Sequence, residues 1–121
     1  MKLKYLALAV SLLAALPAHA HEAKGPHGGR LADATPYHAE LVAKDKVIEI
    51  FLTGESGKPV DPKGFKGIAI FGLGGKAERI TLVPSERGAL SGAAATALPP
   101  SLKGAVQLTA PDGKTATARF D

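Results

Sequence analysis

The stretch from Tyr37 to Thr53 has the sequence YHAELVAKDKVIEIFLT, and in each of its halves every second position is apolar. Such alternation is typical of strands that bury one face. A turn at Lys44-Asp45 would join the two halves as a hairpin, with Glu40 opposite Glu49 and His38 opposite Phe51. We expect one face to point into the core, and its members are Tyr37, Ala39, Leu41, Ile48, Ile50 and Leu52.

The rest of the chain continues this pattern of short apolar segments between glycine- and proline-rich turns, after a long loop at residues 54–67. No segment has convincing helical periodicity. We therefore predict an all-β fold for residues 37–121, an antiparallel β-sandwich of about seven short strands and of immunoglobulin-like size. A small closed barrel is the alternative. The further strands are expected at residues 68–72, 76–83, 89–97, 104–110 and 114–120.

The first 20 residues have the features of a secretory signal peptide. Two lysines precede an apolar run from Tyr5 to Leu16, and Ala18-His19-Ala20 supplies the small residues of a cleavage site. The apolar run is shorter than the roughly 20 residues that a membrane-spanning helix needs. We expect cleavage between Ala20 and His21, a periplasmic or secreted location, and no stable membrane insertion afterwards.

Charge and composition argue against several classes of function. The chain of 121 residues carries 15 Lys+Arg against 11 Asp+Glu, and removing the two lysines of the leader lowers the formal charge from +4 to +2. Nucleic-acid binding and polybasic membrane patches need clustered positive charge, which such a total does not suggest. The chain has no cysteine, so disulfides and thiolate metal sites are excluded.

The segment after the leader, residues 21–36, is polar and glycine-rich, and we expect a flexible arm there. Cleavage would make His21 the N-terminal residue, which offers an amine and an imidazole nitrogen to an ion. His27 follows in the sequence His27-Gly28-Gly29, where glycines allow close approach of the backbone. Imidazole suits Cu(II) and Zn(II), so these histidines are candidate metal ligands. In the alternative interpretation they belong to a disordered terminus.

The expected outer face of the hairpin supplies three further candidates. His38 lies two residues from Glu40, and Glu40 would face Glu49 across the ladder, where like charges repel unless a cation intervenes. Screening by water and salt on a solvated face is the alternative. The serines lack the GxSxG pattern, so we expect no catalytic residues and no enzyme.

Three segments carry a resemblance to known proteins: HEAKGPHGGRL, YHAELVAKDKVIEIFLT and GKPVDPKGFKG. Together they resemble small exported bacterial proteins of heavy-metal handling. The opening is also similar to the N-terminal stretch of periplasmic adaptor subunits of heavy-metal efflux systems of the resistance-nodulation-division type. The resemblance implies a periplasmic β-rich domain that binds or passes on copper, zinc or a similar ion, with His21, His27 and His38 at the histidine-bearing positions. The chain lacks the adaptors' coiled-coil hairpin and lipoyl-like domain.

A second resemblance is to periplasmic copper-resistance chaperones with a β-sandwich, which use an N-terminal histidine as a brace. The matching features are His21 and the domain size. The chain after the leader contains no methionine, the soft ligand of Cu(I) carriers, which favours a nitrogen and oxygen site for Cu(II) or Zn(II).

Two functions follow from these observations. The first is a metal-binding module that sequesters or delivers a divalent ion, with the ion and a metal-efflux adaptor or another envelope protein as partners. The second is a non-catalytic interaction domain of the envelope with incidental histidines, for which the outward Val47 and Phe51 are the argument. The candidate metal ligands are His21, His27, His38, Glu40 and Glu49.

Overall fold

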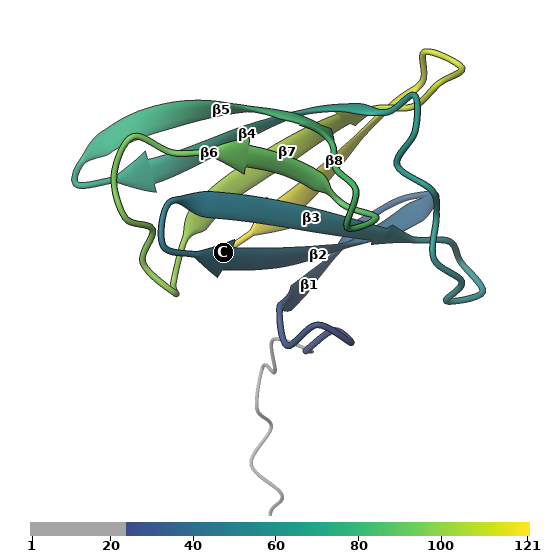
Figure 1. Cartoon of the computed structure of the whole chain (residues 1–121), viewed down its shortest axis with the longest axis horizontal. Helices are drawn as coiled ribbons and strands as arrows, with labels where there is room; N and C mark the ends of the chain where they lie inside the picture. Colours follow the sequence, from purple (N-terminus) through teal and green to yellow (C-terminus); the bar gives the residue numbers. More distant parts are fainter. Residues whose placement is uncertain (1–23) are drawn as a thin grey trace, which may run out of the picture.

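The computed structural model describes residues 24–121, and within them the fold is all-β and antiparallel, as the sequence predicts. There are eight strands in place of the expected seven (Figure 1). They are β1 (Arg30–Ala34), β2 (Tyr37–Lys44), β3 (Val47–Thr53), β4 (Lys66–Leu73), β5 (Lys76–Pro84), β6 (Leu90–Ala93), β7 (Lys103–Thr109) and β8 (Thr115–Phe120). The predicted leader and His21 lie outside the described residues.

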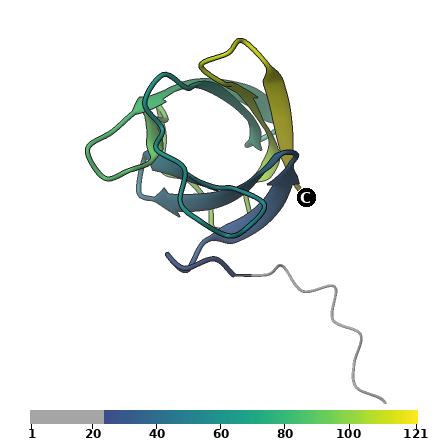
Figure 2. The same cartoon turned by 90° about the vertical axis from the view of Figure 1, so that its right-hand side faces the viewer.

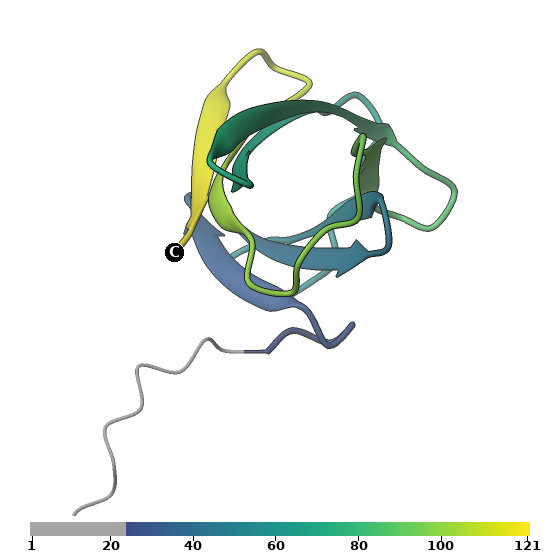
Figure 3. The ribbon, with the colours of Figure 1, turned by 90° about the vertical axis from the view of Figure 1, so that its left-hand side faces the viewer.

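The strands form one sheet in the order β1-β2-β3-β6-β5-β4-β7-β8. The sheet curls until β1 and β8 lie side by side, so that end-on views show a nearly closed ring (Figures 2 and 3). Arg30 of β1 crosses this seam. Its guanidinium donates to the main-chain oxygen atoms of Leu102 and Asp121 and lies 5.7 Å from the centre of the Phe120 ring. The barrel alternative describes this curled sheet more closely than two facing sheets do.

The core occupies the inside of the ring, where alternate residues of the strands meet. The predicted inward set of the β2–β3 hairpin is confirmed, since Ala39, Leu41, Ile48, Ile50 and Leu52 are all buried there. Side chains from the other strands and from three loops complete the core, among them Phe65, Phe71, Ile80, Leu82, Leu90, Leu102, Val106, Leu108 and Phe120.

The register predicted for this hairpin is wrong by two residues. The turn consists of Asp45 and Lys46, so Lys44 pairs with Val47 and Glu40 pairs with Phe51. Asp45 has φ of 54°, the left-handed conformation that a two-residue hairpin turn requires at its first central position and that aspartate tolerates. A shift of two residues leaves every side chain on its predicted face, but it separates Glu40 from Glu49.

The expected arm is more ordered in its described part than a flexible segment would be. Residues 30–34, which we expected in the arm, form β1 and pair with β2 along their whole length. The chain before β1 makes a tight turn, with a bridge between Lys24 and Arg30 and a hydrogen bond of 2.8 Å from the Gly25 N–H to the Gly29 carbonyl. We call residues 24–29 the N-terminal turn.

Candidate functional site

Glu40 is the centre of the site, and it is buried although its position on β2 faces outward. Only 3% of its surface is exposed, because the N-terminal turn covers it. Its carboxylate accepts hydrogen bonds from the backbone N–H groups of His27 and Gly29, both at Oε2, at 2.8 and 2.9 Å. The other oxygen, Oε1, lies 2.7 Å from Nδ1 of His27. The carboxylate that we expected on a solvated face therefore fastens the N-terminal turn to the sheet.

The His27 ring lies against the ring of Phe51. Their ring centroids are 3.7 Å apart and the rings are inclined by only 9°, so they stack. Phe51 is 7% exposed as a result. The outward apolar contact that we expected at Phe51 is thus made within the chain, and Phe51 is not available to a partner while the turn is docked.

Two glycines allow the turn to approach this closely. A Cβ on Gly25 would lie 2.3 Å from the carboxyl carbon of Glu40, and one on Gly29 would lie 2.4 Å from the carbonyl oxygen of Leu41. Both distances are below any van der Waals contact. Glycine is therefore the only residue that fits at either position without displacing the turn.

The hydrogen bonds also determine which nitrogen of His27 carries a proton. A carboxylate has no hydrogen to donate, so Nδ1 of His27 is the donor to Oε1 of Glu40. In the neutral ring the lone pair then lies on Nε2. Among residues 24–121, nothing forms a hydrogen bond with this Nε2, and 47% of the side chain is exposed. Metal-binding histidines typically have this arrangement, with one nitrogen donating to a carboxylate and the other free for the ion.

His38 lies beside this cluster but belongs to a separate pair. It faces Asp33 across the β1–β2 ladder, and its Nδ1 is 2.9 Å from Oδ1 of Asp33. Both residues are exposed. A hollow of about 320 Å³ adjoins the N-terminal turn here, and its walls are Pro26, Leu31, His38, Glu40, Phe51, Thr53 and Gly57.

The predicted ligand residues that the structure describes therefore fall into three separate pairs. Glu49 is bound to Arg87, with 2.8 Å between Oε2 and Nε, and Glu40 and His38 have the partners given above. Within residues 24–121 no group of three or more histidine, aspartate or glutamate side chains is arranged to hold an ion. His21 lies outside the described residues, so its predicted role stays a prediction.

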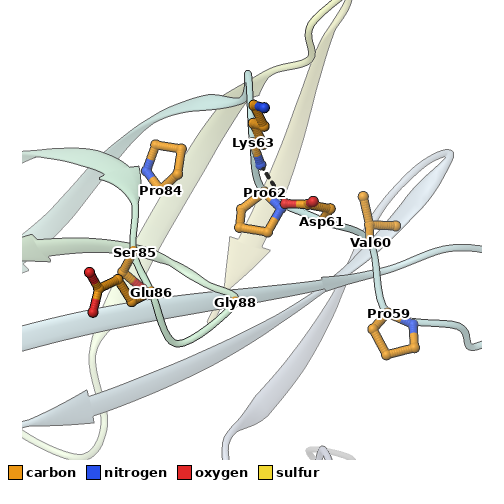
Figure 4. Close-up of a pocket in the computed structure, with 9 residues that line it drawn as sticks. All are labelled: Pro59, Val60, Asp61, Pro62, Lys63, Pro84, Ser85, Glu86 and Gly88. Atoms are coloured by element: carbon orange, nitrogen blue, oxygen red, sulfur yellow. Dashed lines mark hydrogen bonds between the residues drawn. The ribbon is translucent and has the colours of Figure 1, made fainter.

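A larger hollow, of about 670 Å³, lies between the loop after β3 and the β5–β6 turn (Figure 4). One wall runs from Pro59 to Lys63, and the other contains Pro84, Ser85, Glu86 and Gly88. The backbone N–H of Lys63 donates to the side chain of Asp61, two residues earlier in the same loop, at 3.0 Å (Figure 4). None of the predicted site residues lines this hollow.

Comparison of the chain with protein-family models, with curated proteins and with solved structures finds no match. Within residues 24–121, no helix has the length and apolar character that a membrane span requires. The function proposed below therefore depends on the chemistry of the residues themselves.

The roles of Glu40 and Phe51 are what the sequence-based interpretation missed. Both were expected on an open outer face, because strand alternation assigns faces and does not show what covers them. The available signal was His27-Gly28-Gly29, whose glycines already indicated a close approach of the backbone. An outward glutamate beside an outward phenylalanine would be a plausible receiving surface for such a segment.

Proposed function

We propose that this protein binds a divalent transition-metal ion of the copper or zinc type through Nε2 of His27, as a non-enzymatic binding module. The observation that carries the proposal is the contact of 2.7 Å between His27 Nδ1 and the buried Glu40 carboxylate. That contact orients the imidazole and fixes its tautomer before an ion arrives. Without it, binding of the ion would have to supply the free energy of both changes.

The position of the ring supports the same conclusion. Stacking on Phe51 holds the plane of the imidazole, while about half of the His27 side chain remains open to solvent. A histidine that only fastens the turn would need the Nδ1 bond but not an open Nε2. A ring that is held on one side and open on the other is suited to take up an ion from solution.

His27 by itself would bind an ion weakly, so further donors are needed. The predicted N-terminal residue, His21, would add an amine and an imidazole, and it precedes His27 by only six positions. Together they would supply the nitrogen donors that Cu(II) prefers in tetragonal geometry and that Zn(II) also accepts. In this proposal Glu40 supports the ligand and does not touch the ion, and export to the periplasm would bring the site to its metal.

Titration of the exported protein with Cu(II) and with Zn(II), followed by calorimetry, tests the proposal. We expect a single tight site in the wild type and its loss in His27→Ala. His38→Ala is the matched comparison, because it removes an equally exposed histidine that pairs with Asp33 and not with Glu40. Circular dichroism and thermal melting establish that both variants are folded.

Sequencing the N-terminus of the exported protein tests the contribution of His21. A chain that begins at His21 retains the amine and imidazole pair, and one that begins later does not. If the wild type binds neither ion more tightly than His27→Ala does, the proposal is wrong, and the interaction domain of the envelope becomes the better explanation.

A further inference from the structure

The outward positions of β5, β4, β7 and β8 carry positive charge and no negative charge. Burial alternates along these strands, so the exposed face of each can be identified by residue. We call the outward side of these four strands the basic face. Its charged members are Lys66, Arg79, Lys103 and Arg119, and all four are exposed.

The two halves of the ring therefore differ in charge. The outward positions of β1, β2 and β3 carry three acidic residues, Asp33, Glu40 and Glu49, and each has a partner of its own. Among residues 24–121, by contrast, no side chain forms an ion pair with any of the four basic residues. A near-neutral total charge therefore conceals a face whose positive charge is not compensated within the described chain.

The ladder places these charges around an exposed apolar residue. Arg79 pairs with Ile70, Ile70 pairs with Ala105, and Ala105 pairs with Arg119. The two arginines thus stand in one row, separated by three strand spacings or about 14 Å. Ile70 lies between them and is 43% exposed, because its neighbours on the face, such as Gly72 and Ala105, are small.

The two lysines extend the charge along the strands. Lys103 is two residues from Ala105 on β7, so it lies diagonally opposite Arg119, about 7–8 Å away. Lys66 pairs with Thr109 near the other end of β7, about 20 Å from Lys103. The basic face is thus an area of roughly 14 by 20 Å with positive charge near its margins and Ile70 within it.

We propose that the basic face binds the surface of an anionic phospholipid membrane. Charge complementarity requires an anionic partner, and the shape of the face favours an extended one. The face is the convex outer wall of the curled sheet (Figures 2 and 3), and the hollow beside Lys66 measures only about 130 Å³. A convex wall does not enclose a peptide, whereas it can rest on closely spaced headgroup phosphates with Ile70 between them.

The proposal gives a measurable affinity difference. A basic residue close to an anionic membrane strengthens binding about five-fold. The double variant Arg79→Gln/Arg119→Gln should therefore bind about 25-fold more weakly than the wild type. The matched control is Lys44→Gln/Lys58→Gln, which removes the same charge from exposed positions away from the basic face.

Co-sedimentation of the exported protein with vesicles tests this, using phosphatidylcholine with and without about 30% phosphatidylglycerol. A chelator excludes bridging by metal ions. All three proteins share one N-terminus, so residues before Lys24 contribute equally to each. We expect binding to the anionic vesicles alone, reduced in the arginine variant, unchanged in the lysine control, and abolished by about 0.5 M salt.

Three results would overturn the proposal. They are no binding of the wild type to anionic vesicles at low salt, equal weakening in the two double variants, and capture by immobilised polyglutamate without binding to vesicles. The last result would assign the basic face to an acidic protein instead. None of these measurements involves His27, so their outcome is independent of the metal site.

Discussion

Replacing Glu40 with glutamine would separate the support of the N-terminal turn from the preparation of His27 for a metal. Glutamine keeps the shape of the side chain but has one acceptor oxygen and one NH2 donor. Both backbone N–H groups, those of His27 and Gly29, point to the single oxygen Oε2, at 2.8 and 2.9 Å. The amide oxygen will therefore take that place, and the NH2 group will face Nδ1 of His27.

This exchange reverses the tautomer of His27. Nδ1, which donates to the carboxylate at 2.7 Å, must now accept from the amide, so the proton moves to Nε2. A protonated Nε2 cannot coordinate an ion. We expect metal affinity to fall at least 10- to 100-fold, the range found when the support of a metal-binding histidine is removed.

The effect of Glu40→Gln on stability should be modest. Hydrogen bonds to a charged group contribute about 1.5–3 kcal/mol and those between neutral groups about 0.5–1.5 kcal/mol, so each bond weakens by roughly 1 kcal/mol. Removing a buried charge offsets part of that loss. We expect the free energy of unfolding to fall by about 1–3 kcal/mol, with the turn still docked.

Nitrogen-15 NMR of the His27 ring, calorimetric metal titration and urea denaturation measure the three quantities. Glu49→Gln is the matched control, because it changes the same residue type on the neighbouring strand, where the partner is Arg87. Retention of an unprotonated Nε2 in Glu40→Gln, or unchanged metal affinity with the turn docked, would refute the reasoning.

Three further substitutions test the contacts around this site and the seam of the ring. Gly29→Ala places a Cβ 2.4 Å from the carbonyl oxygen of Leu41, so the turn should detach, and amide hydrogen exchange at residues 24–29 should accelerate while the core stays protected. Phe51→Ala removes the ring on which His27 stacks, and the free energy of unfolding measured in urea should fall by about 3–5 kcal/mol. A smaller loss would mean that the turn collapses onto the vacated space. Arg30→Gln removes the guanidinium whose contacts with Phe120 and Asp121 join β1 to the C-terminal end of the chain. A thermal midpoint within error of the wild type would show that backbone packing alone closes the ring.

Alternation along the strands was sufficient to predict the all-β class and the inward residues of the β2–β3 hairpin. It did not determine the register, because the observed pairing and the predicted one differ by two residues and bury the same side chains. The choice depends on the turn, where Asp45 adopts a positive φ. The pairing of Glu40 with Glu49 depended on the predicted register, and it is wrong for that reason.

The candidate site could be predicted only in part, for a different physical reason. His27 was found from its residue type and from the glycines beside it. The burial of Glu40 depends on a contact with a segment 11 to 13 residues away, whose own sequence has no strand periodicity. The charge difference between the two halves of the ring also depends on strand order, which a count of charged residues does not contain.

If His27 binds an ion as we propose, docking of the N-terminal turn and binding of that ion are thermodynamically linked. The Glu40 contact orients His27 only while the turn is docked, so an ion that prefers the oriented ring must also favour the docked turn. Linkage is reciprocal, so the factor by which docking strengthens ion binding equals the factor by which the ion strengthens docking. Gly29→Ala touches neither the ion nor His27, but it detaches the turn. It should therefore weaken metal binding. The factor of this weakening should equal the factor by which metal slows hydrogen exchange of the turn in the wild type. With a merely incidental histidine, neither of the two factors would differ from one.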